Sequence, residues 1–579
     1  MRPGQWIVYV LTALLAAVLL ELNHSRWIGW MLFGATVLLV PIVAVKLLNG
    51  NHAFLLWITC IAVYAGIFLL AWPNEMRVPA VEGTAPEATG VIATDKGDIT
   101  GVYNRDHTVE VYAGIPYAAP PVGSLRWRKP QDHEAWDGVM ACDSFAPMSM
   151  QKRNLPLVDS LIRIIGYHDY RPFATHHIEP VSEDSLYLNV WKPAGDQTGL
   201  PVLVYIHGGS LQTGESWYSD YRGEAFAADG AVMVTMGYRL GVFGFLAEEE
   251  FLAEDGTTGN YGLLDQIKAL EWVQKNIAAF GGDPDNVTLV GESAGAVCVD
   301  ALCVSPLAQG LFQRAILESS TVSADEPPHS FRLFDEALAS GKRLKERYGC
   351  TDANALRDLP ADQLVREQDT QHHITVDGMV LPDTPARLRR QGIHNEQAVL
   401  HGFNGHESSA FIVLDHARLD SYESRLKRSF GGKADAIRKL YPASTNEEAD
   451  RYWAEIYGAQ FFNYSHYCLN RLAAEQNIPV YEYLFTKQNG ALSDWHSGEL
   501  IYAFGNIPPR SRLYDETDRE LSRIMHAYWL NFAKTGDPNG AGLPVFPQNP
   551  TSQKILRLDE TVEVIEEPYL KLYRIFDGD

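Results

Sequence analysis

Cysteine is scarce in this sequence, with only six among 579 residues. The six are Cys60, Cys142, Cys298, Cys303, Cys350 and Cys468. Their spacing matches neither a metal site nor a disulfide framework, so the scarcity excludes a disulfide-built scaffold. Cys298 and Cys303 flank a run of small residues and are predicted to fill the core. The cysteines do not distinguish a reducing from an oxidising compartment, because a chain this long folds without disulfides in either.

A pattern of metal ligands is also missing. Two histidine pairs, His176-His177 and His372-His373, are the nearest candidates. Adjacent side chains point in different directions in any regular element, and no carboxylate or cysteine spacing supports either pair. We therefore predict no metal and no cofactor.

Positive charge is in short supply, because 48 Lys and Arg face 72 Asp and Glu and leave a formal net charge of −24. Residues 1–90 hold equal numbers of basic and acidic side chains, so the excess lies in the remainder. An acidic domain is repelled by nucleic acid and by anionic lipid. We therefore exclude nucleic acid as a partner.

Long apolar runs are present, and they lie at the N-terminus almost without charge. We predict a transmembrane region over 1–75 with three helices at about 6–22, 27–48 and 53–72. A cleaved leader with two spans is less favoured, because no cleavage site precedes the second run. A buried helical hairpin of a soluble domain is a further alternative. Residues 76–90, with their Pro, Ala, Glu and Gly, are predicted to form a linker.

The orientation of such spans depends on flanking positive charge, which is here equally divided. Arg2 and Lys46 would lie on one side, and Arg26 and Arg77 on the other. An N-terminus on the inner side would place the large domain, residues 91–579, on the non-cytoplasmic (periplasmic or extracellular) side after three crossings. The sequence thus predicts a multi-pass membrane protein with the lipid bilayer as a partner.

The most informative stretch of the large domain runs from Gly259 to Gly295. Leu263, Ile267, Leu270, Val273 and Ile277 recur at helical spacing and predict a helix with one apolar face. A short β-branched run at 287–290 then predicts a buried strand, and Gly-Glu-Ser-Ala-Gly follows directly at 291–295. This order of strand, sharp turn and small-residue helix is a nucleophile elbow, which exposes a serine hydroxyl above the sheet. Ser293 is therefore the predicted nucleophile.

Further strands alternate with helices along the domain. They are predicted at 201–206, 232–236, 315–317, 398–403 and 480–485. This alternation predicts an α/β fold whose central, mostly parallel sheet has helices on both faces. Each motif that is predicted to carry chemistry follows a strand, as ligand-binding residues do in such sheets.

Several motifs beyond the elbow resemble one family. Gly114–Gly123 is a proline-rich run, and Glu183-Asp184-Ser185-Leu186-Tyr187-Leu188-Asn189-Val190-Trp191 follows further along the chain. With the elbow they resemble the type-B carboxylesterase and cholinesterase-like family of the α/β-hydrolase superfamily, across nearly all of 91–579. The resemblance implies an α/β-hydrolase fold and serine esterase activity. It also implies that Ser149 and Ser185 stand where relatives carry a disulfide.

A loop for stabilising negative charge is predicted after the strand at 201–206. His207-Gly208-Gly209-Ser210 is an HGG-type oxyanion loop. Acyl transfer places negative charge on the former carbonyl oxygen, and preorganised backbone N–H groups stabilise it. By resemblance the donors are the N–H groups of Gly209, Ser210 and Ala294. Ser210 departs from the commoner third glycine, and its side chain narrows the loop.

A serine nucleophile needs a base, and the base needs an acid that orients it. In α/β-hydrolases the acid and then the histidine follow the serine along the chain. Glu407, in the loop after the strand at 398–403, resembles the acid of the family, while Asp377 and Asp415 are rivals by order alone. His496, after the strand at 480–485, resembles the base.

The other histidines are poorer candidates for the base, because His466 and His526 lie in helix-like runs. Ser319, after the strand at 315–317, is expected by resemblance to help orient the triad. The sequence thus predicts a serine carboxylesterase that hydrolyses small-molecule esters through an acyl-enzyme intermediate. The alternative is a catalytically silent adhesion or interaction module of the same fold, although such modules typically lack the nucleophile or the base.

The segment between Ser149 and Ser185 is predicted to be a mobile rim of the active-site entrance. It contains Leu157, Val158 and the run 161–165, which form an apolar face at helical spacing. We expect this face to cover the pocket or to touch a membrane surface. Packing in the core is the alternative.

Overall fold

The computed structural model describes most of the chain. The described residues are 3–46, 53–81, 83, 86–162, 164, 177–367, 373–412, 415–489, 494–509, 511, 513–548 and 553–578. They divide into two compact units, Met1–Val78 with Lys152–Pro180 and Pro79–Gln151 with Val181–Asp579. Of the two histidine pairs considered above, His176 and His372 lie outside the described residues.

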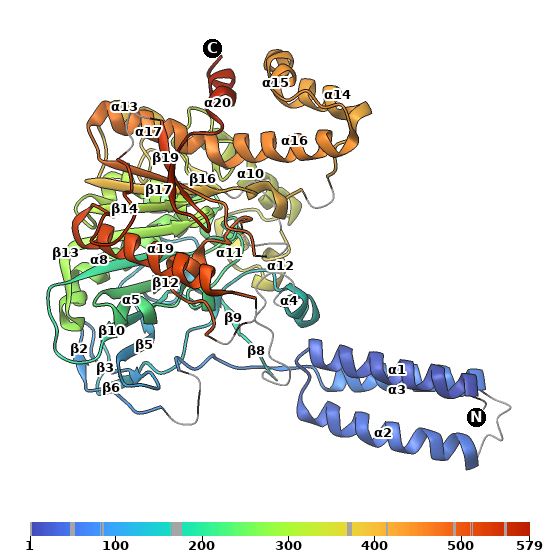
Figure 1. Ribbon diagram of the computed structural model, residues 1–579. Helices are drawn as coiled ribbons and strands as arrows, with labels where there is room; N and C mark the ends of the chain where they lie inside the picture. Colours follow the sequence, from blue (N-terminus) through green and yellow to red (C-terminus); the bar gives the residue numbers. More distant parts are fainter. Residues whose placement is uncertain are drawn as a thin grey trace. The chain divides into compact units, whose positions relative to one another are not determined.

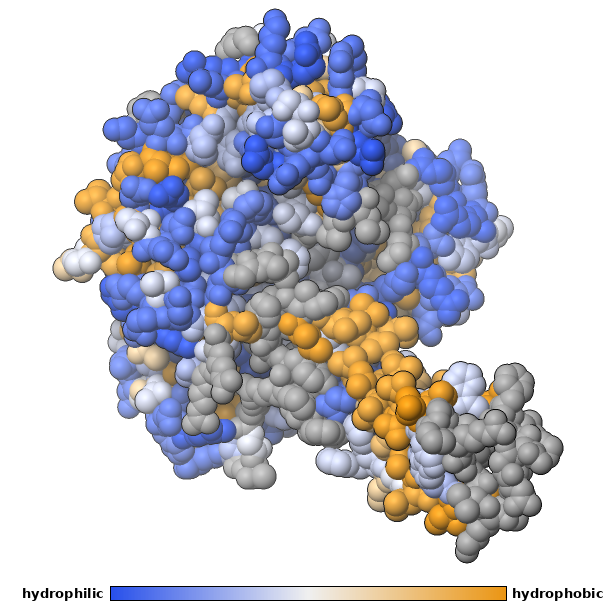
Figure 2. All heavy atoms as spheres, turned by 45° about the vertical axis from the view of Figure 1, so that its right-hand side comes forward, coloured by the Kyte–Doolittle hydropathy of each residue, from blue (hydrophilic) through white to orange (hydrophobic). Residues whose placement is uncertain are grey.

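The smaller unit contains three apolar helices, α1 (Pro3–Leu22), α2 (Trp27–Lys46) and α3 (Ala53–Leu70). Their contact is apolar and is built mainly from α1 and α3, with Leu20, Cys60, Tyr64 and Ile67 among its buried side chains. The Tyr9 hydroxyl on α1 donates to the Val37 carbonyl of α2 at 2.8 Å. Many large apolar side chains on the outer faces of these helices remain exposed, and Figure 2 shows them gathered over this unit.

The membrane prediction for this region is wrong. The three helices form where the apolar runs predicted them, but within the described residues none is long and apolar enough to cross a membrane. α3 has 18 residues, which at about 1.5 Å per residue span about 27 Å, short of a hydrocarbon core of about 30 Å. α2 contains a proline, Pro41, and α1 includes Thr12 and Glu21. The predicted transmembrane region, bilayer partner and multi-pass localisation with an outward-facing domain are therefore not supported.

The predicted rim segment contributes the helix α4 (Pro156–Ile162) to the smaller unit. The Ser160 hydroxyl donates to the Leu22 carbonyl at the end of α1, at 2.6 Å. Val158 and Leu161 are exposed, so packing in a core does not describe this helix. Residues 163 and 165–176 of the segment lie outside the described residues.

The larger unit is built on an eleven-stranded sheet with the order β20-β19-β18-β17-β14-β13-β11-β12-β10-β5-β4. Figure 1 labels several of its strands, among them β13, β14 and β17. Its strands are β4 (Val102–Tyr103), β5 (Val109–Pro116), β10 (Tyr187–Pro193), β11 (Leu200–Ile206), β12 (Val232–Met236), β13 (Gly282–Glu292), β14 (Arg314–Glu318), β17 (Ala398–Asn404), β18 (Val480–Phe485), β19 (Lys554–Leu558) and β20 (Glu563–Glu566). From β12 through β11, β13, β14, β17 and β18 to β19 all neighbours are parallel, whereas both edges are antiparallel. The predicted mostly parallel centre is confirmed.

Short strands form small sheets beside the main one. They are β2 (Ile92–Ala93) with β3 (Asp98–Thr100) and β6 (Val139–Ala141), β7 (Met148–Ser149) with β9 (Val181–Ser182), β15 (Phe331–Arg332) with β16 (Ile374–Thr375), and, in the smaller unit, β1 (Asn74–Glu75) with β8 (His177–Ile178).

Helices of the larger unit lie in the connections between strands, except α20, which follows the last strand. They are α5 (Glu224–Ala228), α6 (Gly241–Phe245), α7 (Glu249–Asp255), α8 (Tyr261–Asn276), α9 (Ala294–Cys303), α10 (Phe334–Arg347), α11 (Ala353–Arg357), α12 (Ala361–Leu364), α13 (Pro385–Arg390), α14 (Leu419–Phe430), α15 (Ala434–Leu440), α16 (Asn446–Gly458), α17 (Tyr464–Gln476), α18 (Leu500–Ala503), α19 (Glu516–Thr535) and α20 (Leu570–Asp577). Helix α8 has the predicted apolar face, and Leu263, Leu270 and Val273 on it are fully buried. The chain turns out of the following 3-10 turn through Gly281, whose φ is 83°. Cys298 and Cys303 on α9 are buried in the core, as predicted.

The two N-terminal family motifs meet in this unit and have a structural role. Arg126, just after the proline-rich run, donates through Nε to Glu183 of the second motif at 2.7 Å. Its Nη1 donates to the carbonyls of Arg357 and Leu359, both at 2.6 Å. An arginine that is 7% exposed is stable there only because its charge and donors are satisfied.

Candidate active site

The predicted nucleophile lies at the turn between β13 and α9. Ser293 has φ 55° and ψ −126°, a conformation that non-glycine residues rarely adopt. Glycines on both sides permit this turn: a Cβ on Gly295 would lie 2.0 Å from the Ile206 carbonyl oxygen, and one on Gly291 would lie 2.5 Å from the Gly295 backbone. The strained turn leaves Ser293 half-buried, with its hydroxyl available at the carboxyl end of the central strands.

Ser293, His496 and Glu407 form one hydrogen-bonded chain. The Ser293 Oγ lies 2.8 Å from His496 Nε2, and His496 Nδ1 lies 2.6 Å from Glu407 Oε2. The other oxygen of Glu407 accepts the Asn404 N–H at 2.7 Å. Each residue follows a strand end: Ser293 follows β13, Glu407 follows β17, and His496 lies in the connection after β18. The sheet therefore brings together three groups that are 89 to 203 residues apart in sequence.

The rival acids from the sequence are engaged elsewhere. Asp377 accepts the N–H groups of residues 379, 380 and 381 and the hydroxyl of Thr257. Asp415 pairs with Arg425 at 2.6 Å. Both carboxylates thus stabilise local structure, and neither is bonded to His496.

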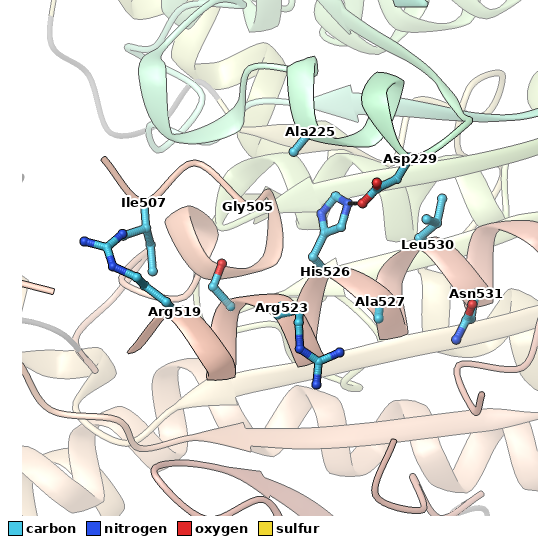
Figure 3. A pocket seen from close by; sticks show the side chains of 11 residues that line it. Ala225, Asp229, Gly505, Ile507, Arg519, Arg523, His526, Ala527, Leu530 and Asn531 are labelled. Atoms are coloured by element: carbon cyan, nitrogen blue, oxygen red, sulfur yellow. Dashed lines mark ion pairs between the residues drawn. The ribbon is translucent and has the colours of Figure 1, made fainter. Parts of the chain in front are cut away.

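The rival histidines are also accounted for. The Nδ1 atoms of His466 and His401 lie 2.9 Å apart, and both rings are fully buried. His526 Nε2 lies 3.2 Å from Asp229 Oδ2, and both residues line a cavity of about 550 Å³. Figure 3 shows this cavity between α5, α19 and the turn after α18, with His526 pointing toward Asp229. Ser293 and His496 do not line it, so this cavity is not the site of the predicted chemistry.

The predicted oxyanion loop has the conformation that leaves its donors available. Gly209 and Ser210 have φ of 103° and 57°, and Ala294 begins α9. Within the described part of the chain, the N–H groups of these three residues make no hydrogen bond. The Ser210 side chain is exposed, as expected of a group that narrows the entrance to the loop.

Carboxylates that the sequence analysis missed surround the histidine. Glu292, directly before the nucleophile, lies 3.5 Å from His496 Nε2 and accepts the Ser497 hydroxyl at 2.5 Å. Glu499 accepts the Ser319 hydroxyl at 2.9 Å and also a hydrogen bond from Asn404. Ser319 thus reaches the predicted site through Glu499. The sequence did contain a signal for these acids, because Glu292 directly precedes the predicted nucleophile and Glu499 follows the predicted base by three residues.

Burial and mutual repulsion shift the protonation of these groups. Burial, together with the charges of Glu292 and Glu407, raises the pKa of Glu499 to about 8. Burial and the neighbouring Glu499 hold the pKa of Glu318 well above its ordinary value, although Trp529 donates to it at 2.9 Å. Burial alone would lower the pKa of His496, but the charges of Glu407 and Glu292 outweigh it and raise the pKa to about 9. The site therefore stabilises an imidazolium strongly.

The arrangement has the parts that acyl transfer requires. His496 Nδ1–H donates to Glu407, which fixes the tautomer whose Nε2 accepts the Ser293 hydroxyl proton. Free N–H groups near the hydroxyl can receive an oxyanion. Ser293, His496 and the oxyanion-loop N–H groups are thus arranged at the carboxyl edge of the sheet as acyl transfer would require.

Comparison with known proteins gives a consistent picture. The profile of the carboxylesterase family matches residues 88–575. Fumonisin B1 esterase of Sphingopyxis macrogoltabida is 33% identical over 511 residues, covering 83% of this chain and 89% of that protein. Human carboxylesterase 3 is 31% identical over 531 residues, covering 85% and 90%. Among solved structures, PNB esterase superposes with a TM-score of 0.70 at 27% identity, covering 84% of this chain and 99% of that one.

Proposed function

Because this chain belongs to the carboxylesterase family and is a serine hydrolase of carboxylic ester bonds, we propose that Ser293, His496 and Glu407 are its catalytic triad. The observation that carries the proposal is the continuous chain of short contacts, 2.8 Å from Ser293 to His496 and 2.6 Å from His496 to Glu407. The hydrolase domain proposed here extends over 91–579, with 76–90 as its linker.

In the first half-reaction, the Ser293 oxygen attacks the ester carbonyl while His496 Nε2 takes the hydroxyl proton. The carbonyl oxygen becomes an oxyanion, which the N–H groups of Gly209, Ser210 and Ala294 stabilise. Glu407 stabilises the positive imidazolium. Collapse of the tetrahedral intermediate breaks the bond to the alcohol oxygen, which receives the proton from His496 and leaves.

In the second half-reaction, water attacks the acyl-enzyme as His496 takes its proton. A second tetrahedral intermediate forms in the same oxyanion site and collapses to release the carboxylic acid and restore Ser293. Ser319 acts as a positioning residue, since its hydroxyl holds Glu499 and the Asn404 amide links Glu499 to the loop of Glu407. The ester substrate is a small molecule, and the proposal needs no cofactor.

The test is the substitution Ser293→Ala. Ester hydrolysis should fall to background while the fold is retained, because the hydroxyl lies at a half-buried turn and its loss creates little cavity. A fluorophosphonate should add its phosphonyl mass to the wild-type chain on the peptide that contains Ser293, and the variant should stay unlabelled. The same atom is removed at an exposed helical serine in Ser424→Ala, which should keep full activity. Undiminished turnover by Ser293→Ala would refute the triad.

A further inference from the structure

Aromatic rings gather beside the proposed catalytic histidine. The Phe411 ring lies edge-on to the His496 ring at 5.0 Å between centroids, and the Phe462 ring lies at 4.8 Å. Phe461 contacts both phenylalanines at 5.0 to 6.1 Å. His329 and Tyr457 each stack on Phe461, at 4.2 and 5.3 Å. We call these five residues the aromatic wall.

Two local features hold the wall in place. Phe461 and Phe462 lie in η8 (Ala459–Asn463), a π-helical turn between α16 and α17. Such wide turns insert a residue into a helix and are frequent at functional sites. Phe411 follows η6 (Glu407–Ala410), the short 3-10 turn that begins with the proposed catalytic acid. The wall is therefore attached to the same loop that orients His496.

The wall is uncharged. Loss of solvent around its ring lowers the pKa of His329 to about 4, so its imidazole is neutral near pH 7. His329 Nε2 lies 3.0 Å from the Phe461 carbonyl, and Nδ1 lies 2.9 Å from the Ser330 hydroxyl. The polar atoms of the ring are thus used within the protein, while its face packs on Phe461.

One ring of the wall is open to solvent. Phe462 is 2% exposed, whereas Phe411 is 44% exposed although it touches the catalytic histidine. A large apolar ring that faces solvent at a reactive site is a place where an apolar ligand gains by burial. A π-face or ring edge additionally favours an aromatic ligand over an aliphatic one of equal size.

The chemistry decides which part of the ester meets these rings. The alcohol oxygen must come within hydrogen-bond reach of His496 Nε2 to receive its proton. The carbonyl oxygen lies toward the donors at Gly209, Ser210 and Ala294 instead. The first carbons of the alcohol therefore lie next to the imidazole and to the rings that flank it.

From this geometry, and resting on the proposed triad, we propose that the enzyme prefers esters whose alcohol carries an aromatic ring, with Phe411 as the residue that recognises the ring. Phe411 packs against the arene of the leaving alcohol as that alcohol takes its proton from His496. Phe462 and Phe461 support Phe411 from behind. The substrate class is thus aryl-methyl and related arene-bearing esters.

The experiment compares benzyl acetate with cyclohexylmethyl acetate, whose alcohols have the same length and similar leaving-group basicity. Wild-type kcat/KM should favour the benzyl ester by about 2- to 12-fold, the range of an aromatic pair beyond simple burial. Phe411→Leu keeps an apolar side chain but removes the ring, and should bring the ratio close to one. The matched control is Phe430→Leu, which removes a half-buried ring stacked on Phe576 and should keep the wild-type ratio.

A second pair of substrates tests whether Phe411 recognises a ring on the alcohol side or on the acid side of the ester. Ethyl phenylacetate and ethyl cyclohexylacetate place the ring on the acid, and their ratio should not respond to Phe411→Leu. A ratio of one for the benzyl pair in wild type, or a response confined to the acid-side pair, would overturn the proposal. Either result leaves the triad standing, since the triad fails only if Ser293→Ala keeps its activity on these esters.

Discussion

Glu292 precedes the proposed nucleophile in the chain and lies close to the proposed base, without belonging to the hydrogen-bonded chain of Ser293, His496 and Glu407. Its carboxylate lies 3.5 Å from His496 Nε2, the atom proposed to accept the serine proton. A negative charge there favours the imidazolium that forms in the transition state. The same charge also favours a protonated histidine in the free enzyme, which cannot act as a base.

This conflict predicts the pH dependence of hydrolysis. The base must be neutral, so kcat/KM falls as pH falls through the pKa of His496. An ordinary histidine would place that midpoint near about 6.5. The neighbouring carboxylates raise the pKa to about 9, so activity should still be rising above pH 7. In Glu292→Gln the midpoint should move to lower pH, because one of the charges that raise the pKa is gone.

Profiles of kcat/KM from pH 5 to pH 10 provide the measurement. The control is Glu423→Gln, at an exposed carboxylate of α14 that pairs with Lys427, and it should leave the midpoint in place. A midpoint that stays unchanged in Glu292→Gln would mean that Glu292 does not set the basicity of His496.

At the scale of elements, two serines stand where the resemblance implies a disulfide. Ser149 ends β7 and Ser185 precedes β10, and their hydroxyl oxygens lie 3.0 Å apart in a buried hydrogen bond. The two positions, matched from sequence motifs alone, are therefore neighbours in the fold. A hydrogen bond replaces the cross-link at the ends of the segment that carries α4.

The double substitution Ser149→Cys and Ser185→Cys should restore this cross-link. The closed loop of 36 residues corresponds to roughly 4 kcal/mol in the chain-entropy model. Oxidation should raise the melting temperature, and a reductant should reverse the rise. Each single cysteine variant is the control and should show no redox response. Cysteines that remain unpaired under oxidising conditions would show that the backbone does not allow disulfide geometry here.

At the scale of the whole molecule, buried titratable groups lower the free energy of unfolding at acidic pH and again at alkaline pH. Burial lowers the pKa of His207 and His401 to about 4. These groups stabilise the fold above about pH 6.5, and that contribution is lost as pH falls toward 4. Burial raises the pKa of Glu567 to about 7 and that of Glu499 to about 8. Their contribution is present below about pH 4.5 and is lost as pH rises through 7 and 8.

The substitution Glu567→Gln isolates the alkaline side. Gln carries no charge to bury, so the variant should match wild type near pH 5 and exceed it near pH 8, by up to about 3 kcal/mol. Denaturant unfolding at a series of pH values measures this difference. Glu566→Gln, at the neighbouring exposed strand position, is the control and should follow wild type throughout. Equal alkaline losses in Glu567→Gln and wild type would assign the loss to other groups.

Much of the fold of the larger unit could be predicted from local patterns in the sequence. The strand at 480–485 and the apolar face of α8 were predicted at nearly their observed bounds, because the spacing of apolar residues along the sequence indicates both kinds of element. The motifs around 293, 407 and 496 were located for a similar reason: each needs particular residues directly after a strand. The three apolar helices also form where they were predicted, but the membrane prediction was wrong, because an apolar run does not by itself make a helix that is long and apolar enough to cross a membrane.

The sequence by itself determined which residues were available for chemistry: a serine on a glycine-flanked turn, a glutamate and a histidine in the expected order, and an HGG-type loop. Only the tertiary structure decided that Glu407 rather than Asp377 meets His496, since both satisfy the order along the chain. The same holds for Glu292, Glu499 and the aromatic wall around His496. Their effect on the histidine depends on distances across the sheet edge, and parallel strands set those distances by bringing together residues that the chain keeps far apart.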